Sequence, residues 1–231
     1  MQKHETPEMF TEIARTYDLL NHVLSLNVDR LWRRDLIRLA EAPDDGCVLD
    51  ACTGTADVAI GFASRLRSGR VFGVDLSAGM LGAGHDKLAR RNLNGRVRLV
   101  ESDVLALPFR DGSFDAVTIA FGLRNLPDYR KGVAEMARVL RPGGKLAILE
   151  FCPPAGGLPL RAYNFYLRRV LPFIGGLVSG SSGAYRYLAS SIGDFLSCEE
   201  VHELVRSAGL KGFQAKRMTG GIAYIYRGEK A

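Results

Sequence analysis

The sequence predicts an α/β fold in which helices cover both faces of a mostly parallel β-sheet. Short apolar runs alternate with segments whose apolar residues recur at helical spacing. Strands that are apolar along their whole length and separated by helices are typical of parallel sheets buried on both sides. The 231 residues are 47% hydrophobic and 24% charged, which excludes a disordered, collagen-like or disulfide-dominated chain.

Three strands and the two helices between them form the first half of the expected sheet. The strands are expected over 47–51, 71–75 and 97–100. The first helix carries Val58, Phe62 and Leu66, and the second is capped by Ser77 and carries Met80, Leu81 and Leu88. Asp50, Asp75 and Asp103 lie at or just beyond the three strand ends, and in such sheets ligands bind at the carboxyl ends of the strands.

The second half adds two more parallel strands and a hairpin. The expected segments are a strand over 114–121, a helix with Val133, Met136, Ala137 and Leu140 that stops at the Arg-Pro-Gly-Gly of 141–144, a strand over 145–151, a helix over 197–208 capped by Ser197, and hairpin strands over 213–218 and 222–226 around Gly220 and Gly221. The prediction is a doubly wound, seven-stranded sheet, mostly parallel, with an antiparallel C-terminal hairpin strand.

We expect a single domain over 1–231. Its parts are an N-terminal helical lid (1–42, with two helices in 7–42), a nucleotide-binding core (46–151), a hydrophobic segment facing substrate or membrane (152–196), and a C-terminal helix and hairpin (197–231). No signal peptide and no run of about 18 apolar residues is present, so a cytoplasmic location is expected, with the inner face of the membrane as an option.

Composition also narrows the function classes. Cys47, Cys52, Cys152 and Cys198 have no C-x-x-C spacing, which predicts free thiols and no metal site. The net charge is 31 − 25 = +6, yet no block of like charge indicates nucleic acid as the partner. An RNA-modifying enzyme is therefore not the expected class.

The loop from Asp50 to Asp57 predicts a nucleotide site. Its small residues let a ligand approach the backbone closely, but Gly54 is its one glycine, so the G-x-G-x-x-G dinucleotide fingerprint is absent. Asp75 offers two acceptor oxygens to the hydroxyls of a ribose, which suits NAD and adenosyl cofactors alike. The alternative is that Asp75 caps the helix that follows it.

A set of motifs over 46–151 resembles those of a known class of enzymes. They are Asp50-x-x-x-Gly54-x-Ala56, the strand-end Asp75, Asp103 with Leu107-Pro108-Phe109, Phe114-Asp115, and Leu140-Arg-Pro-Gly-Gly-Lys145. Together they resemble the class I S-adenosylmethionine-dependent methyltransferases, which have a Rossmann-like, doubly wound sheet.

Further motifs resemble one branch of that class over nearly the whole chain. They are the segment from Phe10 to Ser25, Asp29-Arg30-Leu-Trp32-Arg33, Thr118 to Asn125, Leu149-Glu150-Phe151, Tyr185 to Ile192, and Thr219-Gly-Gly-Ile222. They resemble the family that methylates a ring carbon of demethylmenaquinol, or of the benzoquinol precursor of ubiquinone. The resemblance implies S-adenosylmethionine as methyl donor, no metal, and a polyprenylated quinol as partner.

The resemblance also implies the cofactor contacts. They are Asp50, Gly54, Thr55, Asp75, Leu76, Asp103, Val104 and Ala120. Thr55 would face the methionine part, Asp75 the ribose, and Asp103 and the Val104 amide the adenine. The alternative for Asp103 is a turn residue before Leu107 and Pro108.

Departures from the family pattern lie close to this site. Ala56 stands for a glycine and fits if its backbone need not adopt positive φ, whereas Asn27, also in a glycine position, tolerates the left-handed region. Ala120 replaces a serine, which removes one polar contact.

Catalysis requires a group that accepts the quinol proton or stabilises the oxyanion. Arg124, beside Asn125 just past the fourth strand, is the candidate for stabilising the oxyanion, and the alternative is a salt bridge that closes its loop. His22, Asp18 and Tyr17, on the N-terminal segment, are the candidate proton acceptors, while a structural role for His22 stays open.

Several questions stay open at the level of sequence. Residues 158–178 mix aromatic and aliphatic residues with three arginines, which fits peripheral membrane contact, a wall for the substrate tail, or packing within the domain. The acceptor is expected to be demethylmenaquinol; a methoxybenzoquinol, another hydrophobic small molecule and a non-catalytic scaffold of a quinone-synthesis complex are the alternatives. A homo-oligomer is one expectation for the assembly.

Overall fold

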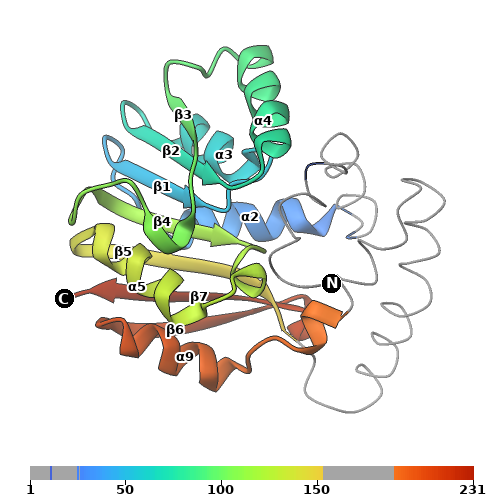
Figure 1. Ribbon diagram of the computed structural model, residues 1–231, viewed down its shortest axis with the longest axis vertical. Coiled ribbons are helices and arrows are strands. Elements are labelled where there is room, and N and C mark those ends of the chain that lie inside the picture. Colours follow the sequence, from blue (N-terminus) through green and yellow to red (C-terminus); the bar gives the residue numbers. More distant parts are fainter. Residues whose placement is uncertain (1–10, 12–24, 26, 153–189) are drawn as a thin grey trace.

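The computed structural model describes residues 11, 25, 27–152 and 190–231, which contain a seven-stranded sheet (Figure 1). Its strands are β1 Cys47–Ala51, β2 Arg70–Asp75, β3 Val97–Glu101, β4 Phe114–Ala120, β5 Leu140–Phe151, β6 Leu210–Met218 and β7 Ala223–Lys230. Their order in the sheet is β3-β2-β1-β4-β5-β7-β6.

Six strands run in one direction and β7 alone runs opposite to them, as the sequence predicts. The chain moves outward from β1 to β3 and then returns to the other side of β1 with β4. This reversal makes a switch point between β1 and β4, where a doubly wound sheet opens a crevice at the carboxyl ends of its strands. β7 pairs antiparallel with β5 and with β6, which closes the sheet with a hairpin.

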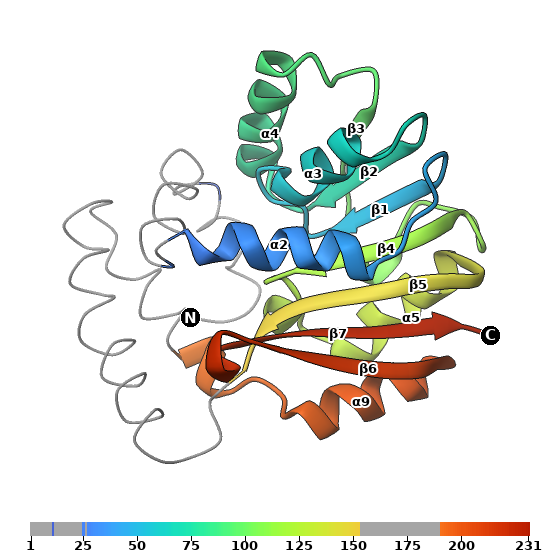
Figure 2. The ribbon, with the colours of Figure 1, turned by 180° about the vertical axis from the view of Figure 1, so that it is seen from behind.

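Helices cover both faces of the sheet. The described helices are α2 Val28–Leu39, α3 Asp57–Arg65, α4 Ala78–Arg90, α5 Tyr129–Val139 and α9 Cys198–Ser207, with short 3-10 turns η2 Val104–Ala106, η3 Leu123–Asn125 and η5 Thr219–Gly221. Figure 2 shows α2 across one face, and Figure 1 shows α5 and α9 on the other. Strand residues alternate accordingly: Val48 packs with the core beneath α2 and α3, and its neighbour Leu49 with the core beneath α5 and α9.

The boundaries around Leu140 differ from the prediction. The helix α5 ends at Val139, and Leu140 already pairs with Phe114 as the first residue of β5. A register shift between Phe114 and Ala116 accommodates the extra residues of 141–144 as a bulged strand end rather than a loop. The hairpin strands are also longer than expected, because β6 starts at Leu210 and β7 continues to Lys230.

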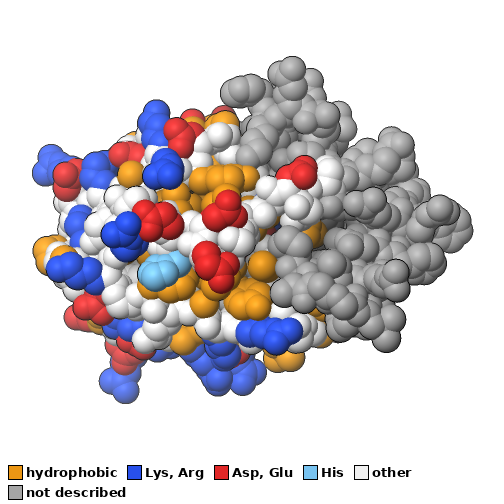
Figure 3. All heavy atoms as spheres, turned by 90° about the horizontal axis from the view of Figure 1, so that it is seen from below, with side chains coloured by type: hydrophobic (Ala, Val, Ile, Leu, Met, Phe, Trp, Pro, Cys, Tyr) orange, Lys and Arg blue, Asp and Glu red, His pale blue; other side chains and the backbone are white. Residues whose placement is uncertain are grey.

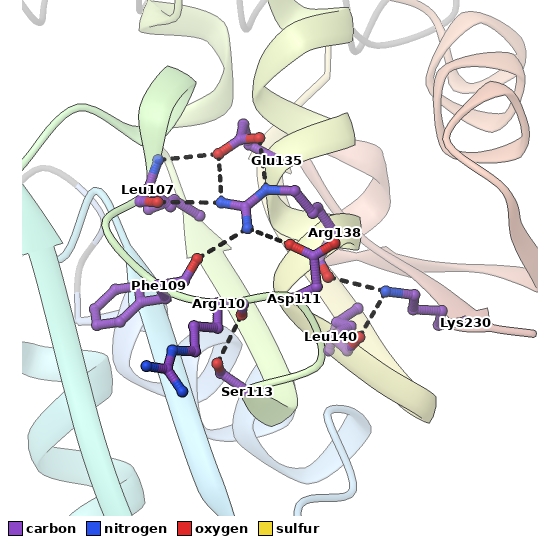
Figure 4. Close-up of polar contacts among 9 residues, drawn as sticks. All are labelled: Leu107, Phe109, Arg110, Asp111, Ser113, Glu135, Arg138, Leu140 and Lys230. Atoms are coloured by element: carbon purple, nitrogen blue, oxygen red, sulfur yellow. Dashed lines mark hydrogen bonds and ion pairs between the residues drawn. The ribbon is translucent and has the colours of Figure 1, made fainter.

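One arginine fastens the loop after η2 to α5 (Figure 4). The guanidinium of Arg138 donates to both carboxylate oxygens of Glu135, to the carbonyls of Leu107 and Phe109, and to Asp111. The pKa of Glu135 is lowered by its hydrogen bond with Arg138. This network joins the segment that runs from η2 to the start of β4 to the C-terminal end of α5.

The described surface carries mixed charge. In Figure 3, Lys and Arg side chains lie beside Asp and Glu side chains over much of the face that is shown, in keeping with ion pairs such as Arg206–Glu203 and Arg138–Asp111. Exposed pairs of this kind contribute about 0 to 1 kcal/mol each. Among the described helices, none combines the length and the apolar character needed to cross a membrane.

Candidate cofactor and substrate site

Asp50 lies at the carboxyl end of β1 with 1% of its surface exposed. The sheet register places Thr118 of β4 directly beside it, and Thr118 Oγ1 donates to Asp50 Oδ1 at 2.8 Å. Thr53 Oγ1 donates to the other oxygen at 2.6 Å. Burial raises the pKa of Asp50 to about 6, opposed by these two hydrogen bonds and by the charge of Arg33.

The loop between β1 and α3 has three residues in the left-handed region. They are Cys52 (φ 50°), Gly54 (φ 54°) and Ala56 (φ 68°). The expectation that the backbone of Ala56 need not adopt positive φ was wrong, since its φ is positive. This conformation costs about 1 kcal/mol relative to a relaxed backbone. The fold holds it there because Ala56 N donates to Thr53 O at 2.9 Å and its methyl group is fully buried. Asn27, in the left-handed region before α2, is as predicted.

Asp75 fastens this loop to the end of β2. Its Oδ2 accepts from Gly54 N at 2.8 Å, and its Oδ1 accepts from Ser77 N at 2.9 Å. Burial raises the pKa of Asp75, and these backbone donors oppose the shift. Ser77, not Asp75, caps α4, because its side chain accepts from Met80 N. Next to Asp75, Leu76 leaves 49% of its surface exposed at the mouth of the site.

Thr55 is held by a lysine from α4. Lys87 Nζ donates to Thr55 Oγ1 at 2.8 Å and to Asp57 Oδ1 at 2.6 Å. Lys87 is not among the residues predicted from sequence, and its position on the inner side of α4 is the signal that could have indicated it. This contact fixes the hydroxyl of Thr55 inside the loop.

Asp103 and Ala120 complete the edge at β3 and β4. Asp103 caps η2, accepting from Leu105 N at 2.8 Å, so the turn role that the sequence left open is present in the structure. Val104, the first residue of η2, is buried, and Ala120 is half-buried at the end of β4. Val104 follows β3 and Ala120 ends β4, and both strands end at the same edge as β1 and β2, which carry Asp50 and Asp75.

Arg124 takes part in a buried ion pair. Its Nη1 lies 2.9 Å from Glu150 Oε1, with 5% and 0% of the two side chains exposed. Nη1 also donates to the carbonyl of Phe121, and Nε lies 3.4 Å from Ser191 Oγ. The loop-closing salt bridge is thus present. Asn125 Nδ2 approaches the carbonyl of Phe121 at 3.4 Å, which brings Asn125 and Arg124 to one loop.

An aromatic cluster lies next to this loop. The ring centroid of Phe121 is 4.6 Å from that of Phe151 and 6.1 Å from that of Trp32. Above Phe121, the guanidinium carbon of Arg33 lies 5.4 Å from the ring centre. These residues belong to sequence motifs that predicted no role for them, because their contact depends on how α2 lies across the sheet.

The carboxylates make this edge of the sheet electronegative. The charges of Asp75, Asp50, Asp103 and Glu150 all act on the thiol of Cys52, and together with burial they raise its pKa well above the usual value. Cys52 therefore stays a neutral thiol and is no nucleophile. A ligand that carries a positive charge is favoured at this point.

The residues fit an adenosyl ligand with an amino-acid tail. A side chain at Gly54 would meet nothing within 4 Å, so there is open space above the loop. Asp75 supplies carboxylate oxygens at the same place, and the buried Nε of Arg33 has no hydrogen-bond partner. No group of three or more potential metal ligands occurs within the part of the chain that the structure describes.

The candidate proton acceptors Tyr17, Asp18 and His22 lie outside the described residues. So do most of 1–42 and of 152–196. Thr11 is described, and its hydroxyl lies 2.8 Å from Ser77 Oγ at the start of α4. One residue of the N-terminal segment therefore contacts the rim of the site.

Comparison with known proteins identifies the family. Residues 1–230 match the model of the ubiE/COQ5 methyltransferase family. This chain belongs to that family. Among curated relatives, the ubiquinone/menaquinone biosynthesis C-methyltransferase UbiE of Geobacter sulfurreducens is 47% identical over 96% of this chain and 87% of its own. The demethylmenaquinone methyltransferase of Thermus thermophilus is 46% identical over 96% of this chain and 100% of its own.

Solved structures share the fold at low sequence identity. An S-adenosylmethionine-dependent methyltransferase from Aquifex aeolicus has a TM-score of 0.64 and 17% identity, covering 86% of this chain and 89% of its own. The [4+2]-cyclase SpnF reaches 0.71 with 16% identity, covering 100% and 97%. Since a cyclase shares this class I architecture, the fold alone does not fix the reaction. The family match carries the assignment of methyl transfer.

Proposed function

We propose that this chain methylates a ring carbon of a polyprenylated quinol with S-adenosylmethionine, converting demethylmenaquinol to menaquinol. Family membership and the relatives named demethylmenaquinone methyltransferase, each 46% identical, support this acceptor. The benzoquinol precursor of ubiquinone is the second candidate, because the 47% identical relative is named for both pathways.

The observation that carries the proposal is the electronegative edge of the sheet around Cys52. Four carboxylates from β1, β2, β5 and the segment after β3 act on that one point. When bound, S-adenosylmethionine supplies an activated methyl group on a sulfonium. The carboxylates favour a cationic centre there, while the neutral thiol of Cys52 does not compete for the methyl group.

The cofactor contacts follow the strand ends. In this proposal, Asp75 binds the ribose hydroxyls, and Asp103 with the Val104 amide binds the adenine. Thr55 and Gly54 face the methionine part, Leu76 covers the base, and Asp50 and Ala120 line the floor. The exposure of Leu76 and the open space above Gly54 support this arrangement.

Arg124 and Asn125 face the acceptor in this proposal. Glu150 balances the charge of Arg124. The described contacts of Arg124 use its Nε and Nη1 and leave its Nη2 group available. The group can therefore donate hydrogen bonds to a developing oxyanion and stabilise it by oriented donors rather than by net charge. One of Tyr17, Asp18 and His22 takes the proton, and the contact between Thr11 and Ser77 supports a lid formed by their segment.

The acceptor's isoprenoid tail places the reaction beside a lipid phase. We propose that 158–178 contacts that phase at the inner face of the membrane, on the basis of its mixed apolar and basic sequence. Co-sedimentation with anionic vesicles tests this contact. Recovery of all the protein in the supernatant at low salt would contradict it.

The reaction is tested by methyl transfer to two chemically reduced, short-tailed acceptors in detergent. The donor is labelled S-adenosylmethionine, and the acceptors are a demethylnaphthoquinol and a methoxybenzoquinol. We expect the label in the naphthoquinol. Transfer to both acceptors assigns dual service, and transfer to the benzoquinol alone overturns the main acceptor. If neither is labelled while the cofactor binds, the acceptor class is wrong.

A further inference from the structure

Among the described cations at this site, Arg33 has the fewest hydrogen bonds and ion pairs to the protein. It lies on α2 between the buried residues Asp29, Trp32 and Leu36. Its Nε is buried and has no hydrogen-bond partner, and the nearest carboxylate oxygen, Oδ2 of Asp29, is 3.5 Å away. Asp29 also accepts from Ser25 Oγ at 2.6 Å. An arginine donor buried without an acceptor costs free energy unless a ligand completes it.

Its position is fixed at the carboxyl edge of the sheet. The guanidinium carbon lies 5.4 Å from the ring centre of Phe121, directly after β4. Phe121 is braced by Phe151 and Trp32, so the guanidinium rests above a ring that cannot easily move. The charge of Arg33 also acts on Asp50, at the end of the neighbouring strand β1.

Two other cations among the described residues, Lys87 and Arg124, lie at this edge, and both are already paired with protein groups. Lys87 donates to Thr55 and Asp57, and Arg124 is paired with Glu150. Yet a cofactor with an amino-acid tail brings a carboxylate into an edge that Asp50, Asp75 and Asp103 make electronegative. That carboxylate requires a cation with free donors, and guanidinium matches it with two parallel hydrogen bonds.

We propose that Arg33 binds the α-carboxylate of the bound S-adenosylmethionine. This inference rests on the proposed function and adds a recognition residue from α2, outside the strand-end motifs. It makes the N-terminal part of α2 a wall of the cofactor site. It also explains why Arg33 is drawn inward while the adjacent Arg34 is exposed.

The test compares two ligands that differ in this carboxylate. Calorimetry measures the dissociation constants of S-adenosylmethionine and decarboxylated S-adenosylmethionine for the wild type, Arg33→Met, Arg33→Lys and Arg34→Met. We expect the wild type and Arg34→Met to prefer the carboxylate ligand. Arg33→Met should weaken S-adenosylmethionine about ten- to a hundredfold and leave the decarboxylated ligand within about twofold. Arg33→Lys should be intermediate.

Arg33→Met also leaves the buried carboxylate of Asp29 without its cation, which could destabilise the fold. A second variant, Asp29→Asn with Arg33→Met, removes that buried charge and keeps the comparison valid, with thermal melting as the control for folding. Equal weakening of both ligands, or of neither, overturns the role of Arg33 while the proposed function survives. If the wild type binds neither ligand, the proposed function fails first.

Discussion

The guanidinium of Arg124 and the carboxylate of Glu150 form a buried ion pair, with Nη1 2.9 Å from Oε1. Glu150 Oε2 also accepts from the backbone of Arg124 at 3.2 Å. The pair therefore joins the loop after β4 to the end of β5, next to the aromatic ring of Phe151. The arrangement restrains the guanidinium that we propose faces the substrate, and it links the ends of β4 and β5.

Arg124→Ala should lower turnover more than it lowers cofactor affinity. The variant removes the proposed oxyanion donor, while the proposed cofactor contacts at Asp75 and Asp103 stay in place. It also strands Glu150 without a cation, which costs about 3 to 5 kcal/mol of stability. Steady-state rates and calorimetric cofactor binding measure the two effects, and equal loss of both would place Arg124 beside the cofactor instead.

The double variant Arg124→Ala with Glu150→Gln is the control for that stability loss. Glutamine keeps the size of Glu150 and removes the stranded charge, so its melting temperature should lie above that of the single variant. Its turnover should remain as low as in the single variant, because the donor is still missing. Recovered turnover would mean that Arg124 acts on stability alone.

Asp50→Asn should change how stability depends on pH. The pKa of Asp50 in the folded state, about 6, lies above its ordinary value of 3.8, so the folded state binds the proton more tightly than the unfolded state. The stability this proton contributes is fully present below about pH 4 and is lost as pH rises to about 6. The total is at most about 3 kcal/mol.

Urea unfolding of wild type and Asp50→Asn between about pH 4 and pH 7 measures this effect. The free energy of unfolding of the wild type should fall relative to that of the variant as pH rises from about 4 to about 6. Above about pH 6 the difference between the two should stay constant. Taking the difference removes the opposite contributions of Glu41 and Glu135, whose pKa values are lowered. A difference that stays constant with pH would show that Asp50 is ionised throughout.

Gly122→Ala should lower the stability of the fold, because the added methyl group would overpack the contact with Cys52. A Cβ at Gly122 would lie 2.5 Å from Cys52 Cβ, so one of the two loops must shift. We expect a loss of about 1 to 3 kcal/mol. Adding Cys52→Gly should recover most of it, since Cβ of Cys52 is the obstacle and its φ of 50° suits glycine.

Gly82→Ala on α4 is the matched control for that prediction. A Cβ there would meet nothing within 4 Å, and the position is exposed and helical. Alanine should therefore be neutral or stabilise by about 0.4 to 1 kcal/mol. Thermal or urea unfolding compares the variants, and equal losses in Gly82→Ala and Gly122→Ala would argue against a local clash.

Lys87→Met should weaken cofactor binding with little effect on turnover at saturation. The variant releases Thr55 Oγ1 and Asp57, the two acceptors of Lys87 Nζ. Losing one such anchor of a binding loop should cost about tenfold in cofactor affinity. Arg90→Met, an exposed position of the same helix, is the control. Unchanged affinity in Lys87→Met would mean that the loop holds Thr55 without it.

Much of the site follows from short-range sequence signals. Asp50, Asp75 and Asp103 end or follow parallel strands, and the structure brings them to one edge. Ser77 and Ser197 cap helices as predicted, because a cap needs only its own side chain and the backbone three residues on. The end of α5 was wrong because Leu140 fits both a helix and a strand, and pairing with Phe114 decides between them.

The sequence by itself determined the strand order along the chain, the edge where the ligand groups gather and the family resemblance. These depend on apolar periodicity and on residues close together in the chain. Tertiary structure alone decided that Arg124 meets Glu150, that Lys87 holds Thr55 and that Arg33 lies over Phe121. Those partners are distant in sequence or set by how α2 and α4 pack, so burial, charge and free donors appear only when the chain is folded.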